Sequence, residues 1–264
     1  MLHAQELLHQ LNGCRFGHPL YVYQQIGSTS DRAKLLAENG APEGLLIVAE
    51  EQTAGRGRGG RAWLTPPDSA LAFSLVLRPA LTAEQAARLV MLAGVAVCEA
   101  VEQVAEVQPR LKWPNDVLLN GRKFAGLLAE SALRGEALEY VVLGIGLNVS
   151  WAPAPEQVDF PATCLQAEAG REVDRAGLLR AILLRLEARY GQLSDEAAFP
   201  TLFADWRARL VMLGEPAELR LETETLAGVA EDVAADGALL FRLPSGEVRR
   251  VLAGNLHLRP ASAV

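Results

Sequence analysis

Residues 55–61, with the sequence GRGRGGR, place four glycines and three arginines in seven consecutive positions, with no acidic residue among them. Glycine lets a loop bend sharply and brings its backbone close to a ligand. The arginine guanidinium is a fixed fork of donors that matches the oxygens of phosphates and carboxylates. The sequence therefore predicts a mobile loop that closes over a small anionic ligand.

Other interpretations of this loop are a solvated surface segment or an RGG-like RNA-binding segment. RGG segments are usually repetitive, whereas this one is single and lies between two predicted strands. The spacing is not that of a P-loop, because GxxxxGK[ST] is absent. Residues 65–67 (TPP) follow too closely for a Rossmann helix to begin here.

A second candidate group is the run from Lys112 to Asp116 (KWPND). Pro114 biases Trp113 toward an extended conformation, which would project Lys112 and Asn115 rigidly from a strand end. A lysine in that place can neutralise charge that develops on a phosphoryl or acyl oxygen. Asp116 could hold a metal or cap the turn. An ordinary turn with a surface lysine remains the alternative.

Two glycines, Gly144 and Gly146, lie in an otherwise apolar run that ends at Asn148. Glycines in a strand indicate a bulge or the close approach of a ligand. Asn148 could donate its amide to a phosphate oxygen or simply end the strand. The histidines lie near the two ends of the chain and neighbour no nucleophile, which disfavours a Ser-His-Asp hydrolase.

The elements that must position these groups follow from apolar patterning and capping residues. Strands are expected at 21–23, 45–49, 70–77 and 140–149, and Asn120-Gly121 predicts a hairpin that places Lys112 and Lys123 on neighbouring strands or their ends. Helices are expected at 28–39, 82–104, 174–192 and 199–212. After Gly214, short strands alternate with turns, which predicts a small all-β module. We therefore expect domains at 1–213 and 214–264.

Composition limits the class of protein. The 264 residues carry a net charge of −7, half of them are hydrophobic, and the three cysteines show no CxxC spacing. An acidic chain is a poor general binder of nucleic acid, and sparse cysteines argue for a reducing compartment without disulfides or zinc. No signal peptide is evident, and the longest apolar run is too short to span a bilayer. We expect a cytoplasmic protein that binds no membrane.

Taken in order, these motifs resemble those of bacterial biotin protein ligases. The resemblance covers roughly residues 20–150 and rests on several motifs in the right sequence: Ser28-Thr29, residues 52–58, 112–116, 122–126 and 144–148. It implies an α+β fold with a mixed β-sheet catalytic domain of the class II aminoacyl-tRNA synthetase/biotin–lipoyl ligase type. The β-rich tail resembles the small SH3-like C-terminal β-barrel of that family.

The resemblance also implies an activity: joining biotin to ATP as biotinyl-5'-AMP, with Mg²⁺, and transferring biotin to a lysine of a biotin carboxyl carrier protein. It implies Lys112 and Arg58 as catalytic residues. The implied biotin contacts are Ser28, Thr29, Gln52, Gly55, Arg56, Lys112, Gly126, Gly144 and Gly146. The implied ATP and adenylate contacts are Arg56, Arg58, Arg61, Trp63, Asn115, Lys123 and Asn148. No residue is assigned to the metal.

Two positions depart from the family pattern: Ser30 where asparagine is frequent, and Gly59 where some members are basic. The implied partner is the carrier protein of acetyl-CoA carboxylase or a related biotin enzyme. Because only about 20 residues precede the first catalytic strand, we expect no winged-helix module and no DNA binding. The alternatives are a lipoate or other acyl-protein ligase, and a non-enzymatic RNA-binding protein; monomer and homodimer both remain open.

Overall fold

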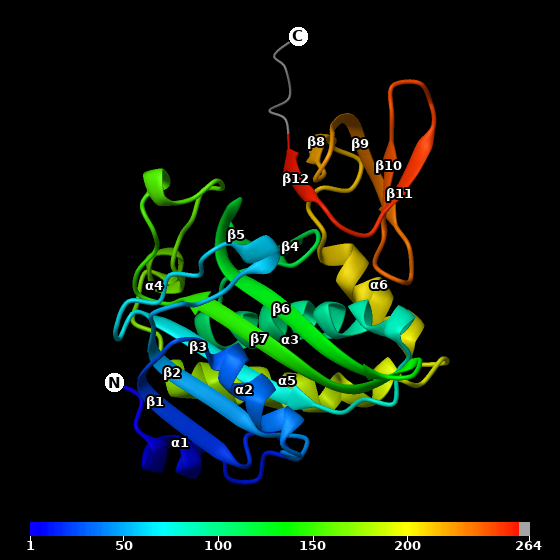
Figure 1. Ribbon diagram of the computed structural model, residues 1–264. Coiled ribbons are helices and arrows are strands. Elements are labelled where there is room, and N and C mark those ends of the chain that lie inside the picture. Colours follow the sequence, from blue (N-terminus) through cyan, green and yellow to red (C-terminus); the bar gives the residue numbers. More distant parts are fainter. Residues whose placement is uncertain (259–264) are drawn as a thin grey trace.

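The computed structural model describes residues 1–258 and contains a mixed sheet that carries the predicted motifs. Within that range the sheet has seven strands in the order β1-β2-β3-β7-β6-β5-β4 (Figure 1). Only β1 and β2 pair in parallel; the other neighbours are antiparallel. The strands are β1 (Leu20–Ile26), β2 (Leu46–Gln52), β3 (Ala70–Leu77), β4 (Arg110–Lys112), β5 (Asp116–Leu119), β6 (Arg122–Arg134) and β7 (Ala137–Asn148).

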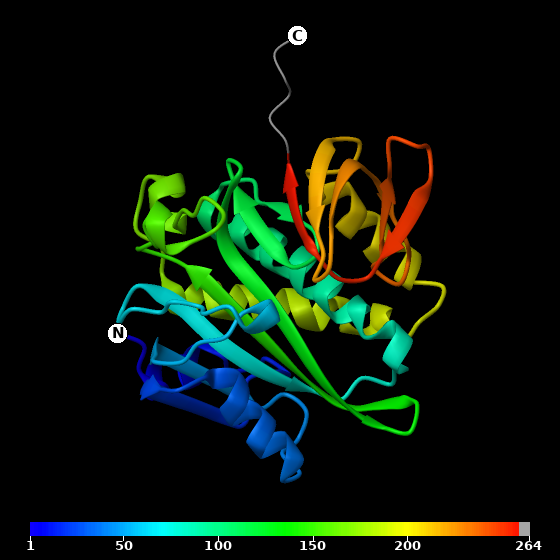
Figure 2. The ribbon, with the colours of Figure 1, turned by 45° about the horizontal axis from the view of Figure 1, so that its top comes forward.

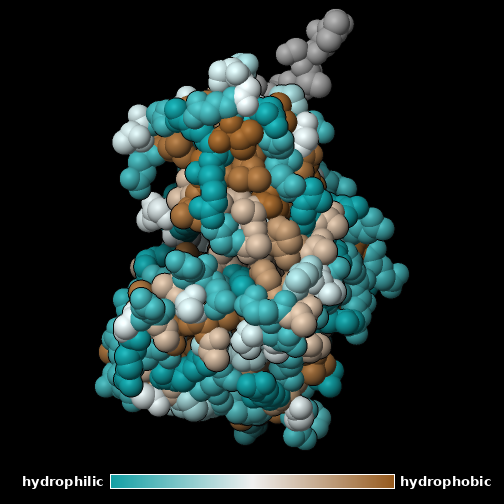
Figure 3. Space-filling view, turned by 90° about the vertical axis from the view of Figure 1, so that its right-hand side faces the viewer, coloured by the Kyte–Doolittle hydropathy of each residue, from teal (hydrophilic) through white to brown (hydrophobic). Residues whose placement is uncertain are grey.

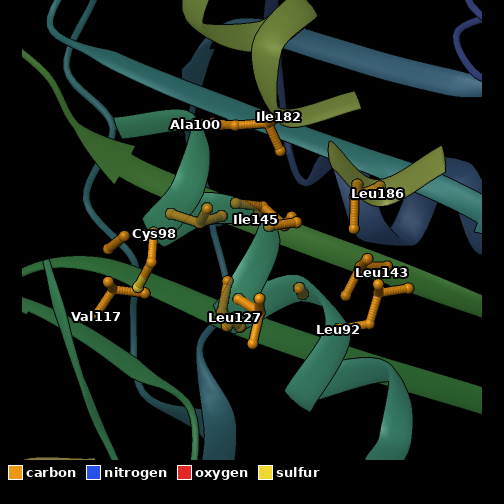
Figure 4. Close-up of a cluster of buried hydrophobic side chains, with 14 of the residues drawn as sticks. Leu92, Cys98, Ala100, Val117, Leu127, Leu143, Ile145, Ile182 and Leu186 are labelled. Atoms are coloured by element: carbon orange, nitrogen blue, oxygen red, sulfur yellow. The ribbon is translucent and has the colours of Figure 1, made fainter. Parts of the chain in front are cut away.

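Helices cover one face of this sheet and bury the main core. They are α1 (Ala4–Gln10), α3 (Ala87–Ala105), α5 (Arg175–Tyr190) and α6 (Phe199–Arg209). Leu92 of α3, Leu186 of α5 and Leu143 of β7 meet in this layer, each essentially inaccessible to solvent (Figure 4). Helix α3 is apolar on nearly all sides because it packs against the sheet as well as against α5 and α6.

The opposite face is only partly covered. Helix α2 (Thr29–Glu38) begins at the predicted cap, where the Ser28 hydroxyl accepts the amide of Asp31. It packs a small cluster, including Ala33, Ile47 and Val142, against β2, β3 and β7. The first turn of α2 reaches Gly144 through Ser30, but Gly126 of β6 and Gly146 of β7 lie beyond this helix and face Trp63 instead. This uncovered part of the sheet is where the candidate site forms.

The Asn120-Gly121 hairpin prediction is confirmed, since both residues have left-handed backbone conformations (φ 48° and 74°) between β5 and β6. The expected adjacency of the two lysines was wrong in detail. Lys112 ends β4 and Lys123 lies in β6, so β5 separates them. Strand β4 was not predicted, because three residues are too few to show an alternation of apolar and polar side chains.

The predicted helices and strands form with shifted ends. Helix α3 starts at Ala87 because residues 83–85 form a separate 3₁₀ turn after Thr82. Helix α6 ends at Arg209, before the predicted end at 212. A short helix, α4 (Leu165–Ala169), also follows the sheet and was not predicted.

The remaining strands form a small antiparallel barrel at residues 216–258. They are β8 (Pro216–Arg220), β9 (Thr225–Val233), β10 (Leu239–Arg242), β11 (Val248–Val251) and β12 (Asn255–Leu258), ordered β11-β10-β9-β8-β12. Figures 1 and 2 place the barrel above one end of the domain that contains the seven-stranded sheet, with β12, in red, nearest to β4 and β5. Residues 259–264 of the expected second domain lie outside the described residues.

No helix within residues 1–258 is long and apolar enough to cross a membrane. The cysteines Cys14, Cys98 and Cys164 are buried and unpaired. Burial raises the pKa of Cys98 to about 12, so its thiol is not reactive at neutral pH.

Candidate active site

A cavity of about 410 Å³ lies on the uncovered part of the sheet. Gly126 of β6 and Gly144 and Gly146 of β7 form its floor. A Cβ atom at Gly146 would lie 2.4 Å from Nε1 of Trp63, and one at Gly144 would lie 2.7 Å from Oγ of Ser30. The strand register is regular at these glycines, so close approach rather than a bulge explains them.

Trp63 lies directly over this floor. Its Nε1 is buried and has no hydrogen-bond partner among the described residues. An unsatisfied buried donor costs free energy, so no hydrogen bond of this donor holds the indole in place. The cavity can therefore enlarge along the glycine floor when the indole moves.

One end of the cavity is a network of neutral polar side chains. Thr29 donates both its amide and its hydroxyl to Oε1 of Gln52, at 2.9 and 3.1 Å. Ser74 donates to Oγ1 of Thr29 at 2.9 Å and lies 3.0 Å from the hydroxyl of Ser30. Sequence reasoning assigned Thr29 and Gln52 but missed Ser74, whose only signal is a hydroxyl in a wholly buried strand. Such a network can orient an uncharged donor–acceptor group of a ligand.

Two of the expected biotin contacts lie outside the cavity lining. The hydroxyl of Ser28 accepts the Asp31 amide at 3.3 Å and so caps α2, and Ser28 does not line the cavity. Gly55 is buried beside the loop, where an added Cβ would lie 2.4 Å from the Trp63 carbonyl oxygen. Both residues shape the loop and the helix around the cavity rather than its surface.

The other end of the cavity contains a buried cluster of charged groups. Asp116 lies between two lysines, with its carboxylate 3.3 Å from Nζ of Lys112 and 2.5 Å from Nζ of Lys123. Burial lowers the pKa of Lys112, although Asp116 opposes this effect. Burial alone would raise the pKa of Asp116, but Lys123 and Lys112 hold that pKa below its usual value. With two lysines to one aspartate, the cluster has a formal charge of +1.

We predict that Asp116→Asn destabilises the fold in a pH-dependent way. The pKa of Asp116 is lower in the folded protein than in the unfolded chain, so its ion pairs stabilise the fold at pH values above the unfolded-state pKa. This stabilisation is lost as the pH falls through the folded-state pKa. The free energy of unfolding should drop by about 3 kcal/mol near neutral pH, and the difference from the parent protein should shrink toward zero in acid. Denaturant titrations over a pH series measure this; a difference that does not change with pH would contradict it.

The glycine–arginine loop folds back on itself over the cavity. The amide of Gly57 donates to the carbonyl of Arg61 at 2.7 Å, and that of Trp63 to Gly55 at 2.8 Å. Arg56, an expected ligand contact, lines the cavity and pairs with Asp31 at 2.5 Å and with Glu130 at 3.0 Å. Those two acids are distant in sequence, so no local pattern revealed them.

Two residues expected to bind adenylate, Asn115 and Asn148, use their side-chain amides within the protein. Asn148, buried, donates to the Thr163 carbonyl at 3.1 Å, and Asn115 donates to the Leu127 carbonyl at 2.6 Å. Both amides thus fix the walls while also lining the cavity. Phe160 was missed; its ring centroid lies 4.7 Å from Nζ of Lys112.

The barrel contributes two cavity residues that sequence reasoning also missed, Asn255 and His257 on β12. Burial, followed by the charges of Arg220 and Lys112, lowers the pKa of His257. Its ring is therefore neutral at neutral pH. Nothing in the sequence around β12 indicates that it reaches a site more than a hundred residues earlier in the chain.

A second cavity of about 260 Å³ adjoins the first between α3 and the barrel. The two cavities share Arg58, Pro114, Asn115, Leu127 and Leu128. The other lining groups of the second cavity are mainly apolar, such as Met91, Trp113 and Leu252. Figure 3 looks onto this side of the molecule and shows apolar residues that run from the upper part, where the barrel lies, down to its junction with the larger domain. The barrel is thus a wall of the site region.

Comparison with known proteins places this fold in a class of acyl-group ligases. Residues 22–148 match the Biotin/lipoate A/B protein ligase family. The biotin protein ligase of Aquifex aeolicus, solved in complex with biotin and ATP, superposes with a TM-score of 0.74 at 30% identity, covering 90% of this chain and 97% of that one.

Two curated relatives narrow this class. The biotin–[acetyl-CoA-carboxylase] ligase of Paracoccus denitrificans is 39% identical over 83% of this chain and 92% of the relative. That of Mycobacterium tuberculosis is 38% identical over 98% of this chain and 96% of the relative. The chain belongs to the biotin protein ligase family. The resemblance and the fold class expected from the sequence are confirmed.

Proposed function

We propose that this protein activates biotin with ATP and transfers the biotinyl group to a lysine of a biotin carboxyl carrier protein. One observation carries the proposal: a single cavity joins a neutral polar network, a glycine floor and a buried cationic cluster. Biotin presents the same order of chemistry, with a ureido ring, an apolar tail and a carboxylate. The family of the chain and the names of its relatives support this assignment.

In the first step an oxygen of the biotin carboxylate attacks the α-phosphorus of ATP, and the bond to pyrophosphate breaks. Two anions must meet, so positive charge has to be in place beforehand. Lys112, held by Asp116, would contact the carboxylate and α-phosphate. Thr29 and Gln52 would orient the ureido ring, and the tail would lie on Gly126, Gly144 and Gly146 after Trp63 moves.

In the second step the neutral amine of the carrier lysine attacks the acyl carbon, the bond to AMP breaks, and the amine proton leaves. The mixed anhydride formed in between is sensitive to water. A closed loop would exclude water and slow escape of the intermediate. Asn148 and Asn115 would hold the adenylate side.

ATP chemistry commonly uses Mg²⁺, which screens the charge of the phosphate oxygens. Among residues 1–258 no three His, Cys, Asp or Glu side chains form a group that could hold a metal ion. Asp116 is already paired with two lysines. The residues present thus form no metal cage, and we assign none of them to Mg²⁺.

The direct test is pyrophosphate release by the pure protein with ATP and Mg²⁺, measured with biotin, with lipoate or with no acid. We expect stimulation by biotin alone. Stimulation by lipoate alone would mean that the substrate is lipoate and that the protein still forms an acyl-adenylate. No stimulation by either, from folded protein, would overturn the proposal. Transfer to the carrier of acetyl-CoA carboxylase is then tested by mass spectrometry.

Replacing Arg58 by glycine should loosen the loop and release the adenylate. Nη1 of Arg58 donates to the Gly254 carbonyl at 3.4 Å, and the residue lines the cavity. A lost charge-assisted contact corresponds to a change of about 10-fold or more. We expect unrelated proteins to become biotinylated at a correspondingly higher rate. Arg134→Gly, at an exposed hairpin end, is the control; unchanged carrier selectivity in Arg58→Gly would refute this role.

A further inference from the structure

The tip of the glycine–arginine loop has little packing of its own. Gly59 and Gly60 have left-handed backbone conformations (φ 66° and 74°), and an added Cβ at either would meet no atom within 4 Å. Arg61 and Ala62 are exposed. Glycine-rich backbone without packing is not held in one conformation by itself. Contacts from elsewhere must therefore fix the tip.

Those contacts come from the turn that enters β12 of the barrel. Nη2 of Arg61 donates to Oδ1 of Asn255 at 2.9 Å, and Nη1 of Arg58 donates to the Gly254 carbonyl at 3.4 Å. Nε of Arg61 also donates to the Arg58 carbonyl at 3.2 Å, which ties the two arginines together. The loop tip is thus fastened at one short segment, residues 254–255.

That segment is itself fixed in space. Asn255 is the first residue of β12 and pairs with Arg220 of β8. Gly254 packs closely, since an added Cβ would lie 2.9 Å from a methyl carbon of Leu219. The barrel is in turn joined to the catalytic domain, where Nε1 of Trp113 donates to the Gly237 carbonyl at 2.9 Å. Trp113 follows Lys112 directly, so the same contacts fix the barrel, the loop tip and the cationic cluster relative to one another.

The chemical type of Asn255 matters. Its amide oxygen accepts from Arg61 without neutralising the guanidinium, which remains available to an anionic ligand. Arg56 shows the opposite case, because Asp31 and Glu130 neutralise it at the rim. We propose that Asn255 is a positioning residue that holds the loop closed over the bound acyl-adenylate through Arg61. This inference rests on the proposed function.

Two substitutions of Asn255 distinguish its role in holding the loop from its effect on the charge of Arg61. Asn255→Ala removes the acceptor, so the loop opens and carrier-free release of biotinyl-adenylate rises about 10-fold, as for one charge-assisted hydrogen bond. Asn255→Asp keeps the acceptor but neutralises Arg61. It should keep the loop closed while raising the KM for ATP, a separation that general destabilisation of the barrel would not produce.

The loop is monitored directly by limited trypsin digestion of the full chain without ligands, with cleavage after Arg58 and Arg61 followed by mass spectrometry. We expect faster loop cleavage in Asn255→Ala, and parent-like cleavage in Asn255→Asp and in the control Arg249→Ala, whose partners are Glu224 and Glu247. Arg61→Gln combined with Asn255→Ala should release adenylate no faster than the more severe single variant.

Parent-like cleavage and adenylate release in Asn255→Ala would overturn the proposal, as would equal acceleration in Arg249→Ala. The digestion needs no activity, so its result is independent of the function proposed above. If the parent protein releases no pyrophosphate with biotin, that function fails, and the digestion still decides whether Asn255 holds the loop.

Discussion

Replacing Lys112 by alanine is expected to reduce biotin-dependent pyrophosphate release by at least about 100-fold, the usual cost of removing one preorganised group that stabilises developing charge. Lys112 is 6% exposed, ends β4 and lies at the cationic end of the cavity. In water a single lysine would contribute little, but a buried ammonium acts at lower effective dielectric. The loss should appear in kcat, because the charge it stabilises develops in the transition state.

The fold should survive this change because Asp116 keeps its 2.5 Å ion pair with Lys123. Thermal unfolding of the variant checks this point. Lys34→Ala is the matched control, since Lys34 is an exposed lysine of α2 that does not line the cavity. A folded Lys112→Ala protein with turnover near that of the parent would remove Lys112 from the catalytic assignment.

The parts of the site that the sequence predicted are those whose chemistry is local. Pro114 and Asn115 follow Lys112 within one turn, and Asn120-Gly121 specifies its hairpin by backbone conformation alone. Gly144 and Gly146 are separated by one residue, so both face the same side of β7. In each case neighbouring residues determine the geometry, and the pattern is visible without knowledge of the fold.

The parts that escaped prediction depend on tertiary placement. Asn255 and His257 reach the cavity only because the barrel docks beside Trp113. That docking includes the hydrogen bond from Trp113 to Gly237, which lies 124 residues further along the chain. Glu130 meets Arg56 only because β6 passes beneath the loop. Ser28 shows the converse: its local capping role was predictable, and that role places its hydroxyl on α2 and outside the cavity.

Gly146→Val should weaken biotin binding by about 100-fold while leaving ATP binding within a few-fold, because overpacking a filled site costs roughly 1–3 kcal/mol. The position of the first added carbon, 2.4 Å from Nε1 and 2.5 Å from Cε2 of Trp63, cannot coexist with the indole. The side chain would also fill the floor on which the apolar tail of biotin is proposed to lie. Valine suits a strand, so β7 should still form.

Isothermal titration of biotin and of a non-hydrolysable ATP analogue separates the two effects. Gly126→Ala is a graded variant, since its Cβ would lie 3.2 Å from Cζ3 of Trp63 and the ring can shift by that little; its loss should be smaller. Gly191→Ala is the control, with an ordinary helical φ of −61° and open space around its Cβ. Equal weakening of biotin and ATP binding would indicate a damaged fold. Unchanged biotin binding in folded Gly146→Val would mean that biotin does not lie on this floor, because no ligand tail can share the space that the valine side chain occupies.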